Sequence, residues 1–202
     1  MQIFNSSFEN MMNQYFIYGV GIPNTNYSVI LQNINFNNFS VYSTMILIGD
    51  INMIIVNSTF ANIPCNNGDF ISSGSDPNSN FFVIFQNTDF NNVNSSIMIY
   101  LSETILNMVN STLEDNSCEQ LLSFYSTTIL SFKMQNIKIS RNDISLNGIF
   151  ISGGINLILD TFEFNKNYNG EIGFQIESSV GQIAFLNSVV FTNNYVGKLF
   201  NK

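Results

Sequence analysis

The chain has 202 residues, of which 45% are hydrophobic and only 10% are charged, and its formal net charge is −8. This length and apolar content are typical of one folded domain with a substantial core, which argues against disorder. The six Lys and Arg residues are scattered along the sequence. We therefore expect no nucleic-acid partner, since that binding depends on clustered basic side chains.

The sequence predicts no membrane-spanning helix. Such a helix needs about 18 uninterrupted apolar residues, and the nearest approach, residues 45–56, is interrupted by Asp50 and Asn52. The N-terminal residues MQIFNSSFENMMNQ lack the basic start and apolar centre of a secretory signal. Either the chain is cytosolic or a signal lies outside these residues.

Short neutral polar residues replace charge on the expected surface. The chain has 34 Asn, 24 Ser and 10 Thr. Asn tolerates left-handed turn geometry and can hydrogen-bond to its neighbours. This composition favours a chain that turns often and stacks equivalent residues, and it disfavours helices.

One repeat organises the chain and is anchored on an apolar residue. The anchors, 23 to 30 residues apart, are Phe8, Phe36, Phe60, Phe90, Leu113, Ile139, Phe164 and Phe191. The third residue before the anchor is Asn5, Asn33, Asn57, Asn87, Asn110 or Asn136 in the first six copies, and Thr161 or Ser188 in the last two.

The copies differ after the anchor. The first four have Asn at the second position (Asn10, Asn38, Asn62 and Asn92), and the last four have it at the third (Asn116, Asn142, Asn167 and Asn194). We interpret these as two shapes of one corner, each of which uses Asn to let the chain bend.

Apolar residues alternate before each anchor, as in residues 54–60 and 158–164, and a period of two predicts a strand. A second strand is predicted after each corner, at residues 16–20, 45–48, 70–72, 97–101, 121–124, 149–151 and 172–176. Each copy cannot bury its apolar face alone. Stacking copies about 4.8 Å apart would pair each strand with its counterpart. We therefore predict an all-β, single-stranded parallel β-helix of about eight coils, with residues 1–202 as one repeat domain.

The coil length and the segments NSTFAN, NTDFNN, NSTLEDN, NSVVFTNN and NGIFISGGINLIL resemble the pectate-lyase-like right-handed parallel β-helix superfamily. The resemblance covers nearly the whole chain, but it lies in the fold pattern and includes no enzyme signature. It implies a right-handed coil. Analogy with β-helical surface proteins implies an extracellular or cell-surface location.

A leucine-rich-repeat solenoid is the structural alternative. Ile137, Ile139, Asn142 and Ile144 fit its L-x-L-x-x-N-x-L pattern. Against it, the first four copies place Asn too early, and the second stretch of each copy has a strand pattern where that fold has a helix or a loose convex turn.

The sequence predicts no catalytic residue, cofactor or metal. It has no His, which excludes Ser-His-Asp and Cys-His nucleophile systems and His-ligated metal sites in this segment. Only Glu114, Asp115 and Glu119 form an acidic group, and the single Arg, Arg141, falls one coil later. Asp115 and Arg141 both stand two residues after their anchors, so we expect them to stack as a weak candidate polar corner, with a surface ion pair as the ordinary alternative.

The two cysteines, Cys65 and Cys118, each lie five residues after their anchors. They should share a corner two coils apart, at about 9.6 Å. A disulfide needs Cα atoms within about 7 Å. We therefore predict no disulfide between them. Their expected role is to fill the core or a turn, with intermolecular pairing as the alternative.

Two long coils contain the candidate binding loops, at residues 19–26 and 72–80. Insertions in solenoids project from one face and often make the contacts. Ordinary turns are the alternative, but if there is a binding site we expect it near Tyr18, Tyr27 and Asp76.

Six N-glycosylation sequons are present, at Asn5, Asn26, Asn38, Asn57, Asn94 and Asn110. The Asn, Ser and Thr content yields about this number by chance. If the chain is secreted, Asn26 and Asn94 are the better acceptors, because they lie outside the anchor strands.

Neither end of the sequence has an obvious cap, and an uncapped β-helix exposes strand edges. We therefore expect a segment of a longer protein, or end-to-end self-association. The favoured function is a non-enzymatic structural or adhesive surface scaffold that binds protein or glycan. The alternatives are a segment of a carbohydrate-active protein, similar to a polysaccharide lyase or hydrolase, and a leucine-rich-repeat binding module.

Overall fold

The computed structural model describes residues 1–13, 15–21, 27–65, 67–77, 80–177 and 181–201. No helix is assigned in these ranges, so none of them forms a helix that could cross a membrane. The strands are β1 (Gln2–Glu9), β2 (Met12–Asn13), β3 (Ile17–Val20), β4 (Ser28–Asn37), β5 (Ser40–Val41), β6 (Ile46–Gly49), β7 (Asn52–Pro64), β8 (Ile71–Gly74), β9 (Phe82–Ser102), β10 (Ile105–Glu114), β11 (Ser117–Ser140), β12 (Asp143–Asn165), β13 (Tyr168–Glu177), β14 (Gly181–Thr192) and β15 (Tyr195–Asn201).

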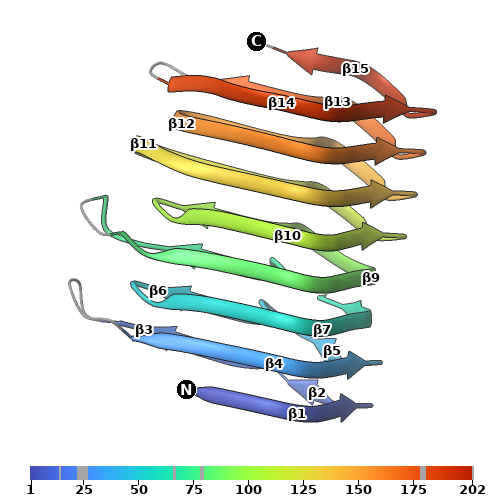
Figure 1. Cartoon of the computed structure of the whole chain (residues 1–202). Coiled ribbons are helices and arrows are strands. Elements are labelled where there is room, and N and C mark those ends of the chain that lie inside the picture. Colours follow the sequence, from blue (N-terminus) through green and yellow to red (C-terminus); the bar gives the residue numbers. More distant parts are fainter. Residues whose placement is uncertain (14, 22–26, 66, 78–79, 178–180, 202) are drawn as a thin grey trace.

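The strands that carry the anchors stack in parallel to form one face of a β-helix (Figure 1). The register pairs every anchor with the anchor of the next coil, from Phe8 with Phe36 at one end to Phe164 with Phe191 at the other. Within the described ranges the eight anchors enclose seven complete turns. The repeat alignment and the parallel β-helix are thereby confirmed.

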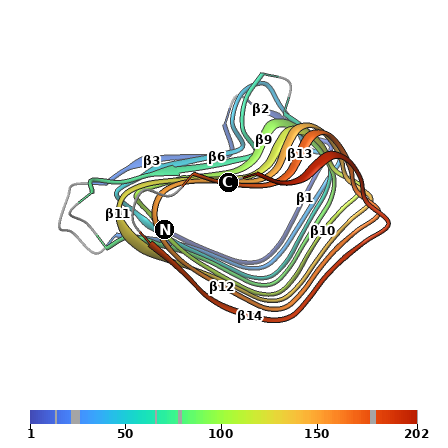
Figure 2. The same ribbon diagram turned by 90° about the horizontal axis from the view of Figure 1, so that it is seen from above.

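The second strand of each copy forms another face of the coil. Strands β3, β6 and β8 pair in parallel and continue into the second half of β9. Seen from above, the chain runs anticlockwise as it climbs from the N-terminus toward the viewer, so the coil is right-handed (Figure 2). The leucine-rich-repeat alternative is wrong, because a hydrogen-bonded sheet occupies the side where that fold has helices or loose turns.

Phenylalanine rings stack inside the first four coils. Phe8, Phe36, Phe60 and Phe90 lie in a column with ring centroids 4.9, 4.9 and 5.3 Å apart and nearly parallel planes. The last three of these rings are fully buried. Burying one such side chain contributes about 1.5–3 kcal/mol, so the anchor column is a main source of stability.

Two bends recur in all eight copies, each at a residue with φ near +50°. One is the third residue before the anchor. The other is the second residue after it, which is Asn10, Asn38, Asn62, Asn92, Asp115, Arg141, Lys166 or Asn193. The chain therefore bends at the same place whether or not Asn is there, which corrects our interpretation that each copy uses Asn to bend. The shifted Asn has another role, described below.

The first three coils differ from the later ones just after this bend. There β2 and β5 form a separate two-stranded sheet, and Val41 bridges to Cys65. In the later coils, the strands β11, β12 and β13 begin at once after the bend. Figure 2 shows the result as a lobe at β2 that extends beyond the corners of the later coils.

Candidate functional site

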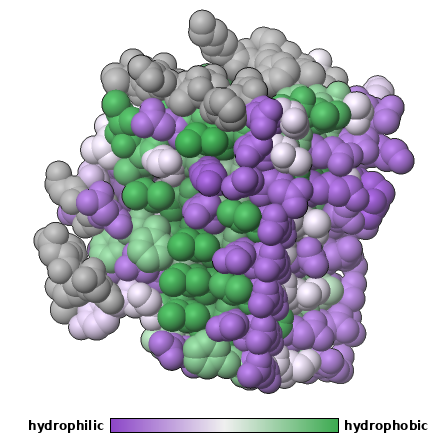
Figure 3. All heavy atoms as spheres, in the orientation of Figure 1, coloured by the Kyte–Doolittle hydropathy of each residue, from purple (hydrophilic) through white to green (hydrophobic). Residues whose placement is uncertain are grey.

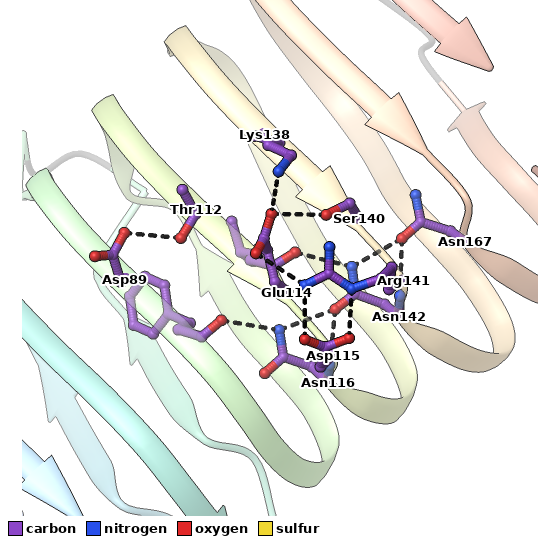
Figure 4. A network of polar contacts seen from close by, with 12 residues as sticks. Asp89, Thr112, Glu114, Asp115, Asn116, Lys138, Ser140, Arg141, Asn142 and Asn167 are labelled. Carbon is purple, nitrogen blue, oxygen red and sulfur yellow. Dashed lines mark hydrogen bonds and ion pairs between the residues drawn. The ribbon is translucent and has the colours of Figure 1, made fainter. Parts of the chain in front are cut away.

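The predicted polar corner is an ion-pair cluster spanning the ends of β10 and β11 (Figure 4). The Arg141 guanidinium donates from Nε to Asp115 Oδ1 and from Nη2 to Asp115 Oδ2, each at 2.8 Å. Its Nη2 also reaches Glu114 Oε2 at 3.1 Å, and Lys138 Nζ lies 2.6 Å from Glu114 Oε1. The structure thus brings Asp115 and Arg141 together as a bidentate pair on adjacent coils.

Glu114 is the electrostatic centre of this corner. Burial raises the pKa of its carboxyl, but hydrogen bonds from Lys138, Ser140 and Arg141, with the Lys138 charge, outweigh burial and lower the pKa below its ordinary 4.5. The neighbouring guanidinium has its pKa raised by its bonds to Asp115 and Glu114. Both groups are therefore charged at neutral pH, and each carboxylate already has a cationic partner. This arrangement stabilises the corner.

The lowered pKa of Glu114 predicts a pH-dependent contribution to stability. Because the folded-state pKa is lower than the unfolded one, this contribution is fully present above pH 4.5 and is lost as the pH falls through the folded-state pKa. We expect Glu114→Gln to be less stable than the unaltered chain at neutral pH and equally stable in acid. Urea unfolding of both proteins across this range measures the difference, and a gap that persists in acid would contradict the assignment.

Beneath the ion pairs lies a ladder of asparagines, the inner Asn ladder. Its members Asn116, Asn142 and Asn167 are drawn in Figure 4, and Asn194 continues it on the next coil. Asn142 shows the pattern: its Nδ2 donates to the Leu113 carbonyl at 2.9 Å and to Asn167 Oδ1 at 2.8 Å, while its Oδ1 accepts from the Asn116 backbone N–H at 2.9 Å. The first three members are each 1% exposed. The shifted Asn thus satisfies backbone groups that the bend leaves unpaired inside the coil.

A second ladder, the outer Asn ladder, runs along the surface at the bend before the anchor. Each Nδ2 donates to the Oδ1 of the preceding coil at 2.7–3.2 Å, through Asn5, Asn33, Asn57, Asn87, Asn110 and Asn136. The sequon residues Asn57 and Asn110 use this nitrogen in the ladder, and a glycan would take its place. Asn94 is exposed on β9, whereas Asn26 lies outside the described residues.

The candidate loop residues lie on the first three coils. Tyr18 and Tyr27 are exposed, and the backbone N–H of Asp76 donates to Asp50 Oδ1 at 2.9 Å. Residues 22–26 and 78–79 of these loops are outside the described ranges. The binding loops therefore stay a prediction.

No disulfide joins Cys65 to Cys118, as predicted, and both side chains are buried. The register places Cys65 and Cys118 at equivalent positions two coils apart, with Ser95 between them. Burial raises the pKa of the Cys65 thiol to about 12 and also raises that of Cys118, where the nearby Asp143 and Glu119 carboxylates add to the effect. Both thiols are therefore neutral at physiological pH.

This burial predicts unreactive thiols. The thiolate is the nucleophile, so we expect the folded chain to resist a thiol-specific disulfide reagent at mildly alkaline pH. Unfolding in denaturant should release both thiols for rapid reaction. A spectrophotometric thiol assay with and without denaturant measures this, and rapid labelling of the native chain would show that the cysteines are more accessible than the structure places them.

A cleft of about 290 Å³ opens beside these cysteines, where the lobe of the first coils ends. It is lined by Cys65, Asn94, Ser95, Ser96, Ser117, Cys118, Glu119, Asp143 and Ser145. Ser95 is 5% exposed, and its Oγ has no hydrogen-bond partner among the described residues. The cleft therefore offers an unpaired buried hydroxyl beneath a rim with the Glu119 and Asp143 carboxylates.

The rim continues along the rod toward the C-terminal coils, through residues at one equivalent position of each coil. Asn94, Ser117, Asp143, Tyr168 and Tyr195 occupy it on successive coils. The two tyrosines are exposed, and their rings stack at 5.3 Å with planes 5° apart. Sequence reasoning missed both the rim and the cleft. The signal for the rim was the shared offset of four residues from the anchor, but no sequence signal marks the cleft.

Sequence reasoning also missed Glu103, a carboxylate that is only 4% exposed at the corner before β10. It accepts hydrogen bonds from Ser126 Oγ at 3.0 Å and from the Thr127 backbone N–H at 2.7 Å. These bonds fix residues 126–130, where the pairing of β11 with β12 shifts register. Glu103 therefore joins two coils at an irregular corner.

Within the described ranges, no cluster of three or more His, Cys, Asp or Glu residues is arranged to hold a metal ion. Comparison with known proteins gives no match to a family model, to a curated protein or to a solved structure. The assignment of function therefore depends on the geometry alone.

Proposed function

We propose that this chain is a non-enzymatic structural or adhesive scaffold, a right-handed β-helix of the pectate-lyase-like superfamily at the cell surface or outside the cell. The main support for this proposal is that polar side chains of neighbouring coils bond to one another. In both Asn ladders the side-chain amides are bonded from coil to coil, and in the ion-pair corner the carboxylates have cationic partners. Groups used in this way make a stiff rod and are not free to act on a substrate.

The superfamily assignment is supported by the right-handed coil, the repeat length and the parallel faces. The location is supported by analogy with β-helical surface proteins and by the low surface charge. Labelling of intact and permeabilised source cells with an antibody against the chain tests the location. We expect equal labelling of both; labelling that requires permeabilisation would contradict a surface position.

The cleft favours a second candidate, which is contact with a glycan within a carbohydrate-active protein. Saccharide hydroxyls donate to carboxylates and amides and accept from hydroxyls, and the rim supplies Glu119, Asp143 and Asn94 beside the unpaired Ser95 hydroxyl. This candidate function requires that the chain bind a polysaccharide. If the chain is part of an enzyme, the polysaccharide must also be cleaved.

One experiment separates these candidates. The purified chain is incubated with plant and microbial polysaccharides, with and without Ca²⁺, and both binding and products are measured. The scaffold predicts no cleavage with any polysaccharide. Cleavage would contradict the scaffold. Binding without cleavage that is lost in Asp143→Asn, and retained in the exposed first-coil control Glu9→Gln, would place an adhesive contact in the cleft.

A further inference from the structure

The anchor-strand face carries a patch of outward apolar side chains. The front patch consists of Phe4, Ile30, Ile54, Val56, Phe82, Ile84, Ile105 and Val109, on β1, β4, β7, β9 and β10. Phe4 is 44% exposed and the other seven are partly exposed, although Ile105 also packs against the core. These positions alternate with buried residues such as Leu31, Ile55 and Phe85. Figure 3 shows the patch as a hydrophobic area bordered by a continuous hydrophilic stripe.

Strand register makes the patch a regular array. Ile30, Ile54 and Ile84 are direct partners on successive coils, and Val56 stands two residues from Ile54 on the same face. Their side chains therefore form a column that repeats about every 4.8 Å along the rod. A second copy of this chain has the same corrugation, so two such faces can interdigitate over the full length of the patch.

Charge is absent from this surface although the chain carries −8 overall. The segments 2–5, 28–33, 52–57, 82–87 and 105–110, which form it, contain no Asp, Glu, Lys or Arg. At most other surfaces two copies would repel each other. Here they meet without charge, and the adjoining outer Asn ladder is a neutral border as well, because its amides bond from coil to coil.

We propose that the front patch is a lateral docking surface for a second copy of this chain, in a two-fold, face-to-face pair. A two-fold pair uses the same patch on both copies, and sheets packed face to face lie about 10 Å apart. Five strands, with four residues on β1 and six on each of the others, give a projected area of roughly 500 Å² per copy. A pair then buries about 1,000 Å², at the small end of specific interfaces, which predicts a weak and reversible dimer.

Sedimentation equilibrium of the full chain over a wide concentration range tests the proposal. We expect the mass to rise from 22.8 kDa toward twice that value and no further. The column of Ile54 and Ile84 indicates which substitutions should disrupt the dimer, since Asn107 and Lys133 occupy the same position on later coils. Ile54→Asn and Ile84→Lys should therefore fold normally and weaken the dimer about tenfold or more.

Ile158→Asn is the matched control, because Ile158 occupies the same column beyond the patch, next to Lys133. It should leave the dimer unchanged, and circular dichroism should show the same fold for all three variants. A chain that is monomeric at every concentration overturns the proposal, as does equal weakening by Ile158→Asn. A mass that rises beyond that of the dimer, and rises equally in the Ile54→Asn variant, would show end-to-end association instead of lateral docking.

Discussion

Asn142→Ala is expected to lower the free energy of unfolding by about 3–5 kcal/mol, a large share of the stability of a typical domain. The Asn142 amide bonds the Leu113 carbonyl, the Asn116 backbone N–H and the amides of its two ladder neighbours. All of this lies inside the coil, where water cannot replace the lost partners. Each buried group left unpaired costs about 1–3 kcal/mol. Urea unfolding followed by circular dichroism measures the change.

Asn35→Ala is the matched control for this substitution. Asn35 is an exposed strand residue next to its anchor, and its backbone has no left-handed φ. The same chemical change there should alter the free energy of unfolding by no more than about 0.5 kcal/mol. Equal effects at the two positions would mean that the inner Asn ladder does not support the corner.

Gly153→Ala should destabilise the chain by about 3 kcal/mol or more, because this position has no room for a side chain. Its φ is +100°, and an added Cβ would lie 1.6 Å from the Ser126 carbonyl oxygen of the preceding coil. The backbone must therefore move at the corner where Glu103 joins the coils. Thermal and urea unfolding report the loss.

Gly74→Ala is the corresponding control on another coil. A Cβ there would meet nothing within 4 Å, and φ is not in the left-handed region. We expect a change within about 0.5 kcal/mol. A Gly153→Ala protein as stable as Gly74→Ala would show that the two coils do not approach closely at Ser126.

The repeat could be read from the sequence because anchor residues such as Phe60 and Phe90 face the interior, where only apolar side chains are tolerated. The alternation of apolar residues predicted the strands. The equal offsets of Cys65 and Cys118 from their anchors predicted that no disulfide joins them. Position within the coil also predicted the contact of Asp115 with Arg141, since equal offsets from the anchor stack in space.

The role of the shifted Asn could not be read in this way. A residue with φ near +50° was expected to be Asn, yet Arg141 and Lys166 adopt the same bend, because the stacked coils impose it. The inner Asn ladder depends on backbone groups one coil away, which no local pattern encodes. The cleft at Ser95 is lined by residues of four successive coils, among them Cys65, Cys118 and Asp143, and so appears only in three dimensions.

The coils stack in one register, and this register places neutral polar side chains in ladders. Nuclear Overhauser effects in the isotopically labelled chain test it most directly. The structure predicts contacts between the Phe60 ring and the rings of Phe36 and Phe90, and between the side-chain amides of Asn142 and Asn167. Contacts confined to residues near in sequence, or displaced from these pairs by even one residue, would contradict it.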